Sequence, residues 1–175
     1  WTEVQGDIDI VSNQAKTKDG LGNIFASARA ESDLSSADHY AQVLAVSMVD
    51  PRRMGPAVRF AAASTTYYFG VTDDELTFDY WGINMMSGGA ESRGLATNTV
   101  GWAAPSNNTL KLNISGSSLE LFQDGVSKVT LTHTLITGNL RTGIAAQKIG
   151  NIFDNFEAAD LAAGSPTTQI IIDDD

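Results

Sequence analysis

The sequence predicts an all-β fold, a sandwich or barrel of many short strands, from three observations. Several segments alternate apolar and polar residues with a period of two, as where Leu110, Leu112 and Ile114 alternate with Lys111 and Asn113. Gly, Pro, Asp and Ser bound these segments, as turn residues do. No window of a dozen residues sustains the i, i+3, i+4 spacing of an amphipathic helix. Together these features favour short strands packed in two layers or a barrel.

Ten segments are expected to be strands. They are Asn23 to Ala30, His39 to Val49, Ala57 to Ala63, Thr66 to Val71, Leu76 to Ile83, Thr109 to Ser115, Leu119 to Gln123, Ser127 to Thr134, Gly143 to Gln147 and Asn151 to Ala158. Strict alternation in the last of them predicts that Ile152, Asp154 and Phe156 share one face and that Phe153 points the other way.

Two connections carry specific turn chemistry. The segment Ser115 to Ser118 contains Gly116 and separates two alternating runs. Asp124 and Gly125 separate the next pair, and an Asp-Gly dipeptide in that setting is a strong hairpin signal because both positions need a positive φ. Both connections are therefore predicted to be tight hairpins.

Length and composition indicate one acidic domain. The chain has 175 residues and a net charge of −10, so phosphate backbones and anionic lipid would repel it, and nucleic acid is a poor candidate partner. The absence of cysteine excludes disulfides, thiolate catalysis and Cys-based zinc sites. No apolar run approaches the roughly 20 residues of a membrane helix, so no membrane insertion is expected.

An ordered set of motifs covers most of the chain. Thr109 to Gly116 (TLKLNISG) is followed by Leu119 to Gly125 (LELFQDG), then by Gly143-Ile-Ala145 and by Phe153 to Ala158 (FDNFEA). Asp38 to Gln42 (DHYAQ) fits an earlier strand of the same pattern. This order resembles the concanavalin A-like lectin/glucanase superfamily, in its laminin-G-like bacterial and phage branch.

The resemblance implies a jelly-roll sandwich of two curved antiparallel sheets over residues 1–161. Domains of this pattern usually have a further strand before the position of Trp1, so a first strand is expected to be missing from the sequence. Residues 162–175 are expected to form a linker and a β-prone acidic tail. Within it Thr167 to Ile172 would add an edge strand to this domain or pair with a neighbouring copy, giving a homo-oligomer.

No catalytic residue is expected. The glucanases of the superfamily carry three acidic residues at alternating positions on one strand, which would flank a glycosidic bond. Glu75 and Asp79 could share a face, but no third acid lies between them. His39 and His133 lie on expected strands without an acid or nucleophile partner, and a lone histidine there is more often structural.

Carbohydrate is the expected ligand, because aromatic rings on the concave sheet of such folds stack on sugars. The candidate ligand-binding residues are Arg59, Tyr67, Tyr80, Trp81 and Trp102. Packing in the core is the alternative role for each of them, and adjacent Tyr67 and Tyr68 must face opposite ways. Arg52-Arg53 is expected in a solvated loop and Asp73-Asp74 in a turn.

One structural calcium ion is implied by the resemblance, and no organic cofactor. Asp154 occupies the position of an Asp that, in related sandwiches, often joins backbone carbonyls of an early loop around Ca²⁺. The alternative is that Asp154 accepts hydrogen bonds or faces solvent.

Two functions are consistent with these features, and a glycoside hydrolase whose acidic residues the pattern does not place is a third, less favoured reading. The first is a non-catalytic recognition or adhesion module, outside the cell, at its surface or on a virion, that binds glycans. The second is a structural subunit of a phage virion or surface filament, assembled through the tail.

Overall fold

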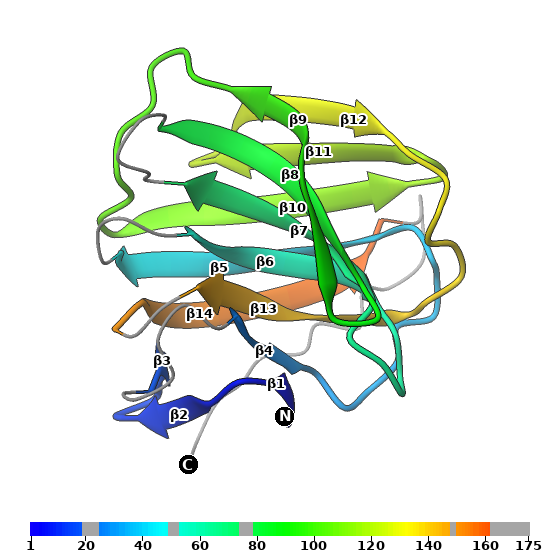
Figure 1. The fold of residues 1–175 in the computed structure, drawn as a ribbon, viewed down its shortest axis with the longest axis horizontal. Coiled ribbons are helices and arrows are strands. Elements are labelled where there is room, and N and C mark those ends of the chain that lie inside the picture. Colours follow the sequence, from blue (N-terminus) through cyan, green and yellow to red (C-terminus); the bar gives the residue numbers. More distant parts are fainter. Residues whose placement is uncertain (19–24, 49–52, 74–78, 148–149, 162–175) are drawn as a thin grey trace.

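The computed structural model describes residues 1–18, 25–48, 53–73, 79–147 and 150–161. Within these ranges the chain forms fourteen β-strands and no helix, which confirms the predicted all-β class (Figure 1). A search of the described residues for a helix long and apolar enough to cross a membrane finds none.

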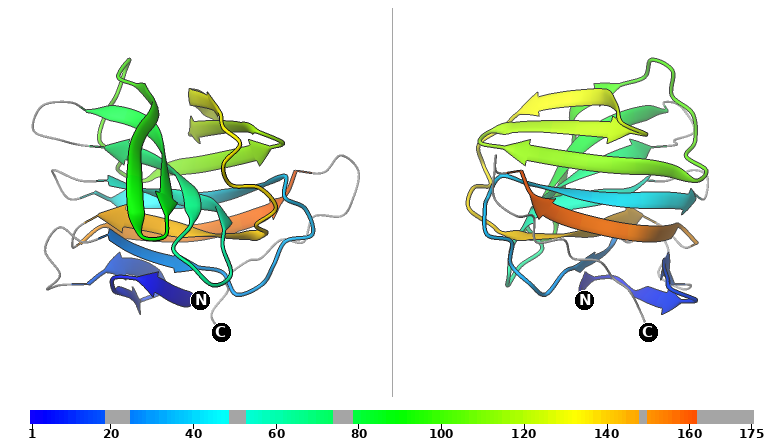
Figure 2. Two further views of the ribbon diagram at one scale, coloured as in Figure 1. Left: turned by 45° about the vertical axis from the view of Figure 1, so that its right-hand side comes forward. Right: turned by 180° about the vertical axis from the view of Figure 1, so that it is seen from behind.

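The strands form two seven-stranded antiparallel sheets. Sheet A has the order β1 (Thr2–Gln5), β4 (Phe25–Arg29), β13 (Arg141–Gln147), β6 (Arg53–Phe60), β7 (Tyr67–Asp73), β8 (Tyr80–Ser87) and β9 (Ala90–Asn98). Sheet B has the order β12 (Val126–Thr132), β11 (Ser118–Gln123), β10 (Asn108–Ser115), β5 (His39–Ser47), β14 (Ile152–Asp160), β3 (Gln14–Thr17) and β2 (Ile8–Val11). The two sheets face each other as layers (Figure 2), as expected of a jelly-roll sandwich.

The main core lies between the sheets and follows the predicted alternation. Leu110, Leu112 and Ile114 are fully buried in it, while Lys111 and Asn113 point outward from the same strand. Burial of large apolar side chains stabilises such a layer by about 25 cal/mol per Å² removed from water. The period-two pattern therefore correctly predicted which face of β10 is internal.

Both predicted hairpins form. Ser115 pairs with Ser118 across the first turn, and Gln123 pairs with Val126 across the second. Asp124 and Gly125 have φ values of 49° and 77°, as a two-residue turn of this handedness requires.

The predicted alternation in the last strand is wrong at one point. Phe153 and Phe156 both pack into the main core, although strict alternation places them on opposite faces. The cause is a β-bulge: Asn155 has φ 48°, and the register of β14 against β5 shifts between Asp154 and Glu157. One extra residue therefore returns Phe156 to the inner face.

Sheet A is packed on both of its faces. β6 and β7 are buried at every position, and β8 at all but its last. On the face turned away from sheet B, a second apolar cluster forms around Phe60, Tyr67, Phe69 and Met86. β8 and β9 curl toward this outer face (Figures 1 and 2), which makes it the concave surface of the sandwich.

Candidate functional site

A network of charged side chains, two buried and two partly exposed, lies on the outer face of sheet A. Arg53 Nη1 donates to both carboxylate oxygens of Glu91, at 2.5 and 2.6 Å. Arg93 Nη2 donates to Asp73 Oδ2 at 2.8 Å, and Arg53 Nε lies 3.1 Å from the same oxygen. Two arginines and two carboxylates thus neutralise each other where water is largely excluded.

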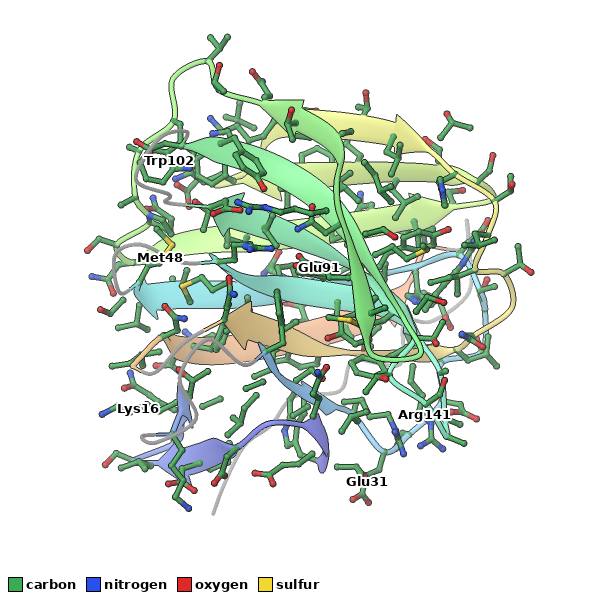
Figure 3. The ribbon with its side chains drawn as sticks, viewed as in Figure 1. Lys16, Glu31, Met48, Glu91, Trp102 and Arg141 are labelled. Atoms are coloured by element: carbon green, nitrogen blue, oxygen red, sulfur yellow. The ribbon has the colours of Figure 1, made fainter. Side chains whose placement is uncertain are left out.

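The sheet register brings these residues together. Arg53 of β6 is paired with Asp73 of β7, which is paired with Tyr80 of β8, so the three side chains stand in a row. Glu91 and Arg93 come from the start of β9, and Glu91 lies in front of the middle of the sheet in Figure 3. The curl of β9 therefore completes a network that the flat part of the sheet begins.

Neutral polar groups extend the network. Asn84 Nδ2 donates to Glu91 Oε1 at 3.0 Å, and its carbonyl oxygen accepts from the backbone N–H of Gly94 at 2.8 Å. Arg93 Nε donates to the Tyr80 hydroxyl at 2.8 Å. These contacts hold the first half of β9 against β8.

Burial dominates the electrostatics of the site. It raises the pKa of Asp73 above its ordinary value, although the Tyr80 hydroxyl, Arg53 and Arg93 all oppose the change. Burial likewise raises the pKa of Tyr80 and of Tyr67 far above the ordinary tyrosine value, so both phenols stay protonated. Asp73 and Tyr67 are completely buried, whereas the side chains of Glu91 and Arg93 retain 19% and 34% exposure.

Several buried polar atoms on this face have unused hydrogen-bonding capacity. Asp73 Oδ1 makes no hydrogen bond of normal geometry within the described part of the chain, although the Tyr80 hydroxyl is close to the carboxylate. The hydroxyls of Ser27 and Tyr67 lie near each other, but neither forms a regular hydrogen bond with a described residue. Such groups are costly to leave unsatisfied.

Two sequence-based expectations about this face are wrong. Arg53 was expected in a solvated loop, but it begins β6 and is only 5% exposed. Asp73 was expected in a turn, but it ends β7 and is fully buried. Charged residues beside Pro51 and Asp74 are typical of loops, which is why Arg53 and Asp73 are expected there. Their ion-pair partners Glu91 and Arg93 lie far along the chain, on a strand that the hydrophobic alternation does not predict.

Of the five residues predicted to bind ligand, Tyr67 and Tyr80 lie on this face. Tyr67 stacks on Phe60 with a centroid distance of 4.1 Å. Tyr80 is 8% exposed and belongs to the charged network through Arg93.

Trp81 and Trp102 lie elsewhere. Trp81 is fully buried in the main core, on the opposite side of β8 from Tyr80. Trp102 lies at the edge of the molecule (Figure 3), packs against that core and donates through Nε1 to Thr72 Oγ1 at 3.0 Å. The structure therefore surrounds both indoles with protein contacts.

Arg59 is also committed to protein contacts. Its side chain is 3% exposed, and its guanidinium donates to the backbone carbonyls of Ala37, Gly116 and Ile136 at 3.2, 2.6 and 2.9 Å. The backbone of Arg59 adopts φ 48°. Its side chain ties three connecting segments together at one end of the sandwich.

Asp154, the predicted calcium ligand, accepts hydrogen bonds from protein groups. Gln14 Nε2 donates to Oδ2 at 3.1 Å, and the backbone N–H of Asn155 donates to Oδ1 at 2.7 Å. Across residues 1–18, 25–48, 53–73, 79–147 and 150–161, no three His, Cys, Asp or Glu side chains are grouped closely enough to hold a metal ion. A site built from Asp154 and backbone carbonyls would not need such a group, and part of the early loop expected to supply those carbonyls lies outside the described residues.

Glu75, half of the acidic pair considered for hydrolysis, lies outside the described residues, as do Leu76 to Phe78 of its expected strand. Among the described residues, the carboxylates on the outer face each hold an arginine. Glycoside hydrolysis needs one protonated carboxyl group and one free carboxylate flanking the bond.

This chain resembles known proteins in structure but not in sequence. No family model matches its sequence, and no curated protein matches it. Carbohydrate binding module CBM66 from Bacillus subtilis matches with a TM-score of 0.64 at 16% identity, over 90% of this chain and 94% of that one. A Bacillus subtilis protein of unknown function with a galectin-like fold matches with a TM-score of 0.66 at 8% identity, over 90% and 88%.

The exoplasmic/lumenal domain of VIP36, in a form bound to Ca²⁺ and Man3GlcNAc, matches with a TM-score of 0.62 at 12% identity. The match covers 93% of this chain and 84% of that one. At such low identity these matches establish the fold alone. The two seven-stranded sheets and these matches show that the chain has a jelly-roll sandwich fold like those of the matched carbohydrate-binding and galectin-like domains.

Proposed function

We propose that this protein is a non-catalytic carbohydrate-binding module whose ligand site lies on the outer, concave face of sheet A. The observation that carries the proposal is the pair Glu91 and Arg93, which solvent reaches and which Arg53 and Asp73 hold in place through charge pairs. Sugar hydroxyls both donate and accept, so one ligand could pair with the Glu91 carboxylate and the Arg93 guanidinium together.

Glu91 and Arg93 are the members of the network that solvent reaches, so they would meet a ligand first. A carboxylate and a guanidinium fixed by neighbouring charges form a pre-organised pair of acceptor and donor, which lowers the entropy cost of binding. The matched carbohydrate-binding module and the glycan-bound VIP36 domain support carbohydrate as the ligand class. We place such a module outside the cell, at its surface or on a virion, where glycans are displayed.

The experiment is a screen on a glycan array that includes Man3GlcNAc, followed by calorimetry with the best ligand. Arg93→Gln should weaken binding by about tenfold or more, since a hydrogen bond to a charged group contributes about 1.5–3 kcal/mol. Arg141→Gln is the matched control. Its side chain also pairs with a carboxylate, Asp33 at 2.6 Å, but β13 places this pair away from Glu91 (Figure 3).

Both variants should melt cooperatively, so that lost binding is not lost folding. Binding across the array that is equal for Arg93→Gln and Arg141→Gln would contradict the proposed site. No binding to any glycan by the folded protein would contradict the proposed function, and would favour the structural subunit.

We retain one calcium ion at Asp154 as part of the proposal, as the family resemblance implies. The ion would have to displace the amide of Gln14 from Oδ2. Calcium chloride should then raise the melting temperature of the native chain but not of Asp154→Asn, because a ligand of the folded state stabilises it by mass action. Equal melting temperatures in calcium and in chelator would contradict this.

A further inference from the structure

The tail segment Thr167 to Ile172, which the sequence predicts to pair with a strand edge of this domain or with a neighbouring copy, lies outside the described residues. That prediction stays untested. β9, by contrast, is described along its whole length and carries the two charged residues that solvent reaches.

Glu91 and Arg93 stand beside a β-bulge in β9. The register of β9 against β8 shifts at Asn84, which lies alone opposite residues 93–95. The Asn84 side chain fills the bulge, because its oxygen accepts from the backbone N–H of Gly94 and its nitrogen donates to Glu91. Asn84 therefore fixes the backbone of the bulge together with the Glu91 carboxylate.

The Glu91 carboxylate can accept one more hydrogen bond, at Oε2. Its other oxygen, Oε1, accepts from Arg53 and from Asn84, and these two bonds occupy both of its lone pairs. Oε2 accepts from Arg53 alone among the described residues, so one lone pair remains. Because 19% of the Glu91 side chain is exposed, this oxygen can meet a donor that comes from solvent.

The four charged side chains of this network, two of each sign, balance one another. An anionic group next to Arg93 would compete with Asp73 for the guanidinium and would meet the carboxylate of Glu91 on the same strand. Desolvating an anion is costly unless a cation compensates for it, and the whole chain carries a net charge of −10. An acidic group on a ligand is therefore disfavoured here.

Aromatic rings contribute little exposed surface to this face. Five aromatic side chains there are each less than a tenth exposed, namely Phe25, Phe60, Tyr67, Phe69 and Tyr80. The Arg93 guanidinium lies over the Tyr80 ring, 5.7 Å from its centroid. That of Arg53 lies over the Phe25 ring, 5.6 Å from its centroid. These two rings thus hold arginines in place, and a ligand meets hydrogen-bonding groups there rather than rings.

We propose that this face binds an uncharged sugar, with one sugar hydroxyl donating to Oε2 of Glu91 and one sugar oxygen accepting from Arg93. A hydroxyl group both donates and accepts, whereas a carboxylate or a sulfate only accepts and so cannot use Glu91. The inference rests on the proposed glycan site and adds the class of sugar that the site takes.

Matched sugars test the inference on the native chain. An array should present each neutral sugar beside an acidic counterpart, such as mannose beside mannuronic acid and galactose beside galacturonic acid. The neutral member of a bound pair should bind at least about tenfold more tightly, because like charges brought together across a binding site repel. Its affinity should change by less than about twofold between about 0.05 M and about 0.5 M sodium chloride, since salt screens only charges.

Glu91→Gln should have opposite effects on the two kinds of ligand. A neutral sugar should bind the variant about tenfold or more weakly than the native chain, because an amide oxygen is a weaker acceptor than a carboxylate. An acidic ligand would instead bind the variant more tightly, since the repelling charge is gone. Glu31→Gln is the matched control. It removes the same charge from a side chain that is 68% exposed and lies at the lower margin of Figure 3, away from Glu91, so affinity should not change.

The outcomes separate this inference from the proposed function. Unchanged or tighter binding by Glu91→Gln, or an acidic sugar bound as tightly as its neutral counterpart, would overturn the inference and leave the glycan site standing. No binding to any glycan would overturn the proposed function as well. The matched sugars and the salt series use the native chain, so they decide the question even where Glu91→Gln fails to fold.

Discussion

The backbone N–H of Arg59 donates to Nε2 of His39 at 3.1 Å, and the His39 side chain is completely buried. The other ring nitrogen, Nδ1, lies 2.9 Å from the carbonyl of Ser36 and donates to it. Since Nε2 accepts and Nδ1 donates, the imidazole is neutral and of one tautomer in the folded protein. Protonation of His39 at Nε2 would break the hydrogen bond from the backbone N–H of Arg59.

Stability should therefore fall as the pH drops below about 6.5. Burial lowers the pKa of His39, and the charge of Arg59 acts in the same direction against the hydrogen bond to Ser36. Because the folded-state pKa lies below the unfolded one, this contribution is present above the ordinary pKa of 6.5 and is lost below it, by up to about 1.4 kcal/mol per pH unit.

Urea unfolding between pH 7.5 and pH 5 measures this loss of stability. In His39→Gln the free energy of unfolding should change less with pH over this range. Asp160 does not interfere in that window. Burial alone would raise the pKa of Asp160, but hydrogen bonds from Ser35 and Ser36 lower it below the ordinary value. The contribution of Asp160 to stability is therefore lost only as the pH falls below about 4. A native profile as flat as that of His39→Gln would refute the assignment.

Arg59→Lys should destabilise the protein by about 2–4 kcal/mol. Lysine cannot reproduce the guanidinium fork that joins the carbonyls of Ala37, Gly116 and Ile136. Chemical denaturation gives the difference, and Arg141→Lys, at a partly exposed ion pair, should change stability by less than about 1 kcal/mol. If Arg59→Lys kept full stability but lost glycan affinity, the ligand role predicted from the sequence would be restored.

Trp102→Phe should cost about 1–3 kcal/mol of stability and leave glycan affinity unchanged. The ring can still pack beside Trp81, but the buried hydroxyl of Thr72 loses its donor. A double-mutant cycle with Thr72→Val isolates the hydrogen bond, since the pair of substitutions removes both partners. Additive single costs would show that the contact contributes nothing.

Gly125→Ala should destabilise the β11–β12 hairpin by about 1–2 kcal/mol through backbone strain alone. Gly125 has φ 77°, while a Cβ placed on it would meet no heavy atom within 4 Å. Gly125→Asn is the comparison, because asparagine tolerates a positive φ better, and it should cost clearly less in thermal unfolding. Equal costs for the two variants would point to a side-chain clash instead.

The sequence patterns predicted the frame of the molecule better than its site. Alternation placed Leu110, Leu112 and Ile114 correctly, and Asp124 with Gly125 marked its turn, because these signals are local. β9 was not predicted, since its residues AESRGLATN show no alternation and are mostly exposed or half-buried. That strand carries Glu91 and Arg93, so the network was missed with it.

The remaining errors have a common physical origin. Arg53 is buried because β9, 38 residues later, supplies Glu91, and Asp73 is buried because Arg53 and Arg93 surround it. A charged residue is predicted on the surface unless its partner is known. Here the register of β6 against β7 brings Arg53 to Asp73, and the curl of β9 brings in Glu91 and Arg93, and no short window of sequence encodes either. The bulge at Asn155 similarly depends on the register of β14 against β5.

The double packing of sheet A has a consequence for how the chain tolerates change. Substitutions in β10 should be accepted or rejected at every other residue, since only one side of that strand is internal. In β6 and β7 both sides are internal, so nearly every position should reject a change of size or charge. A map of permitted substitutions along this sequence should therefore have a two-residue rhythm in one half of the sandwich and none in the middle of the other.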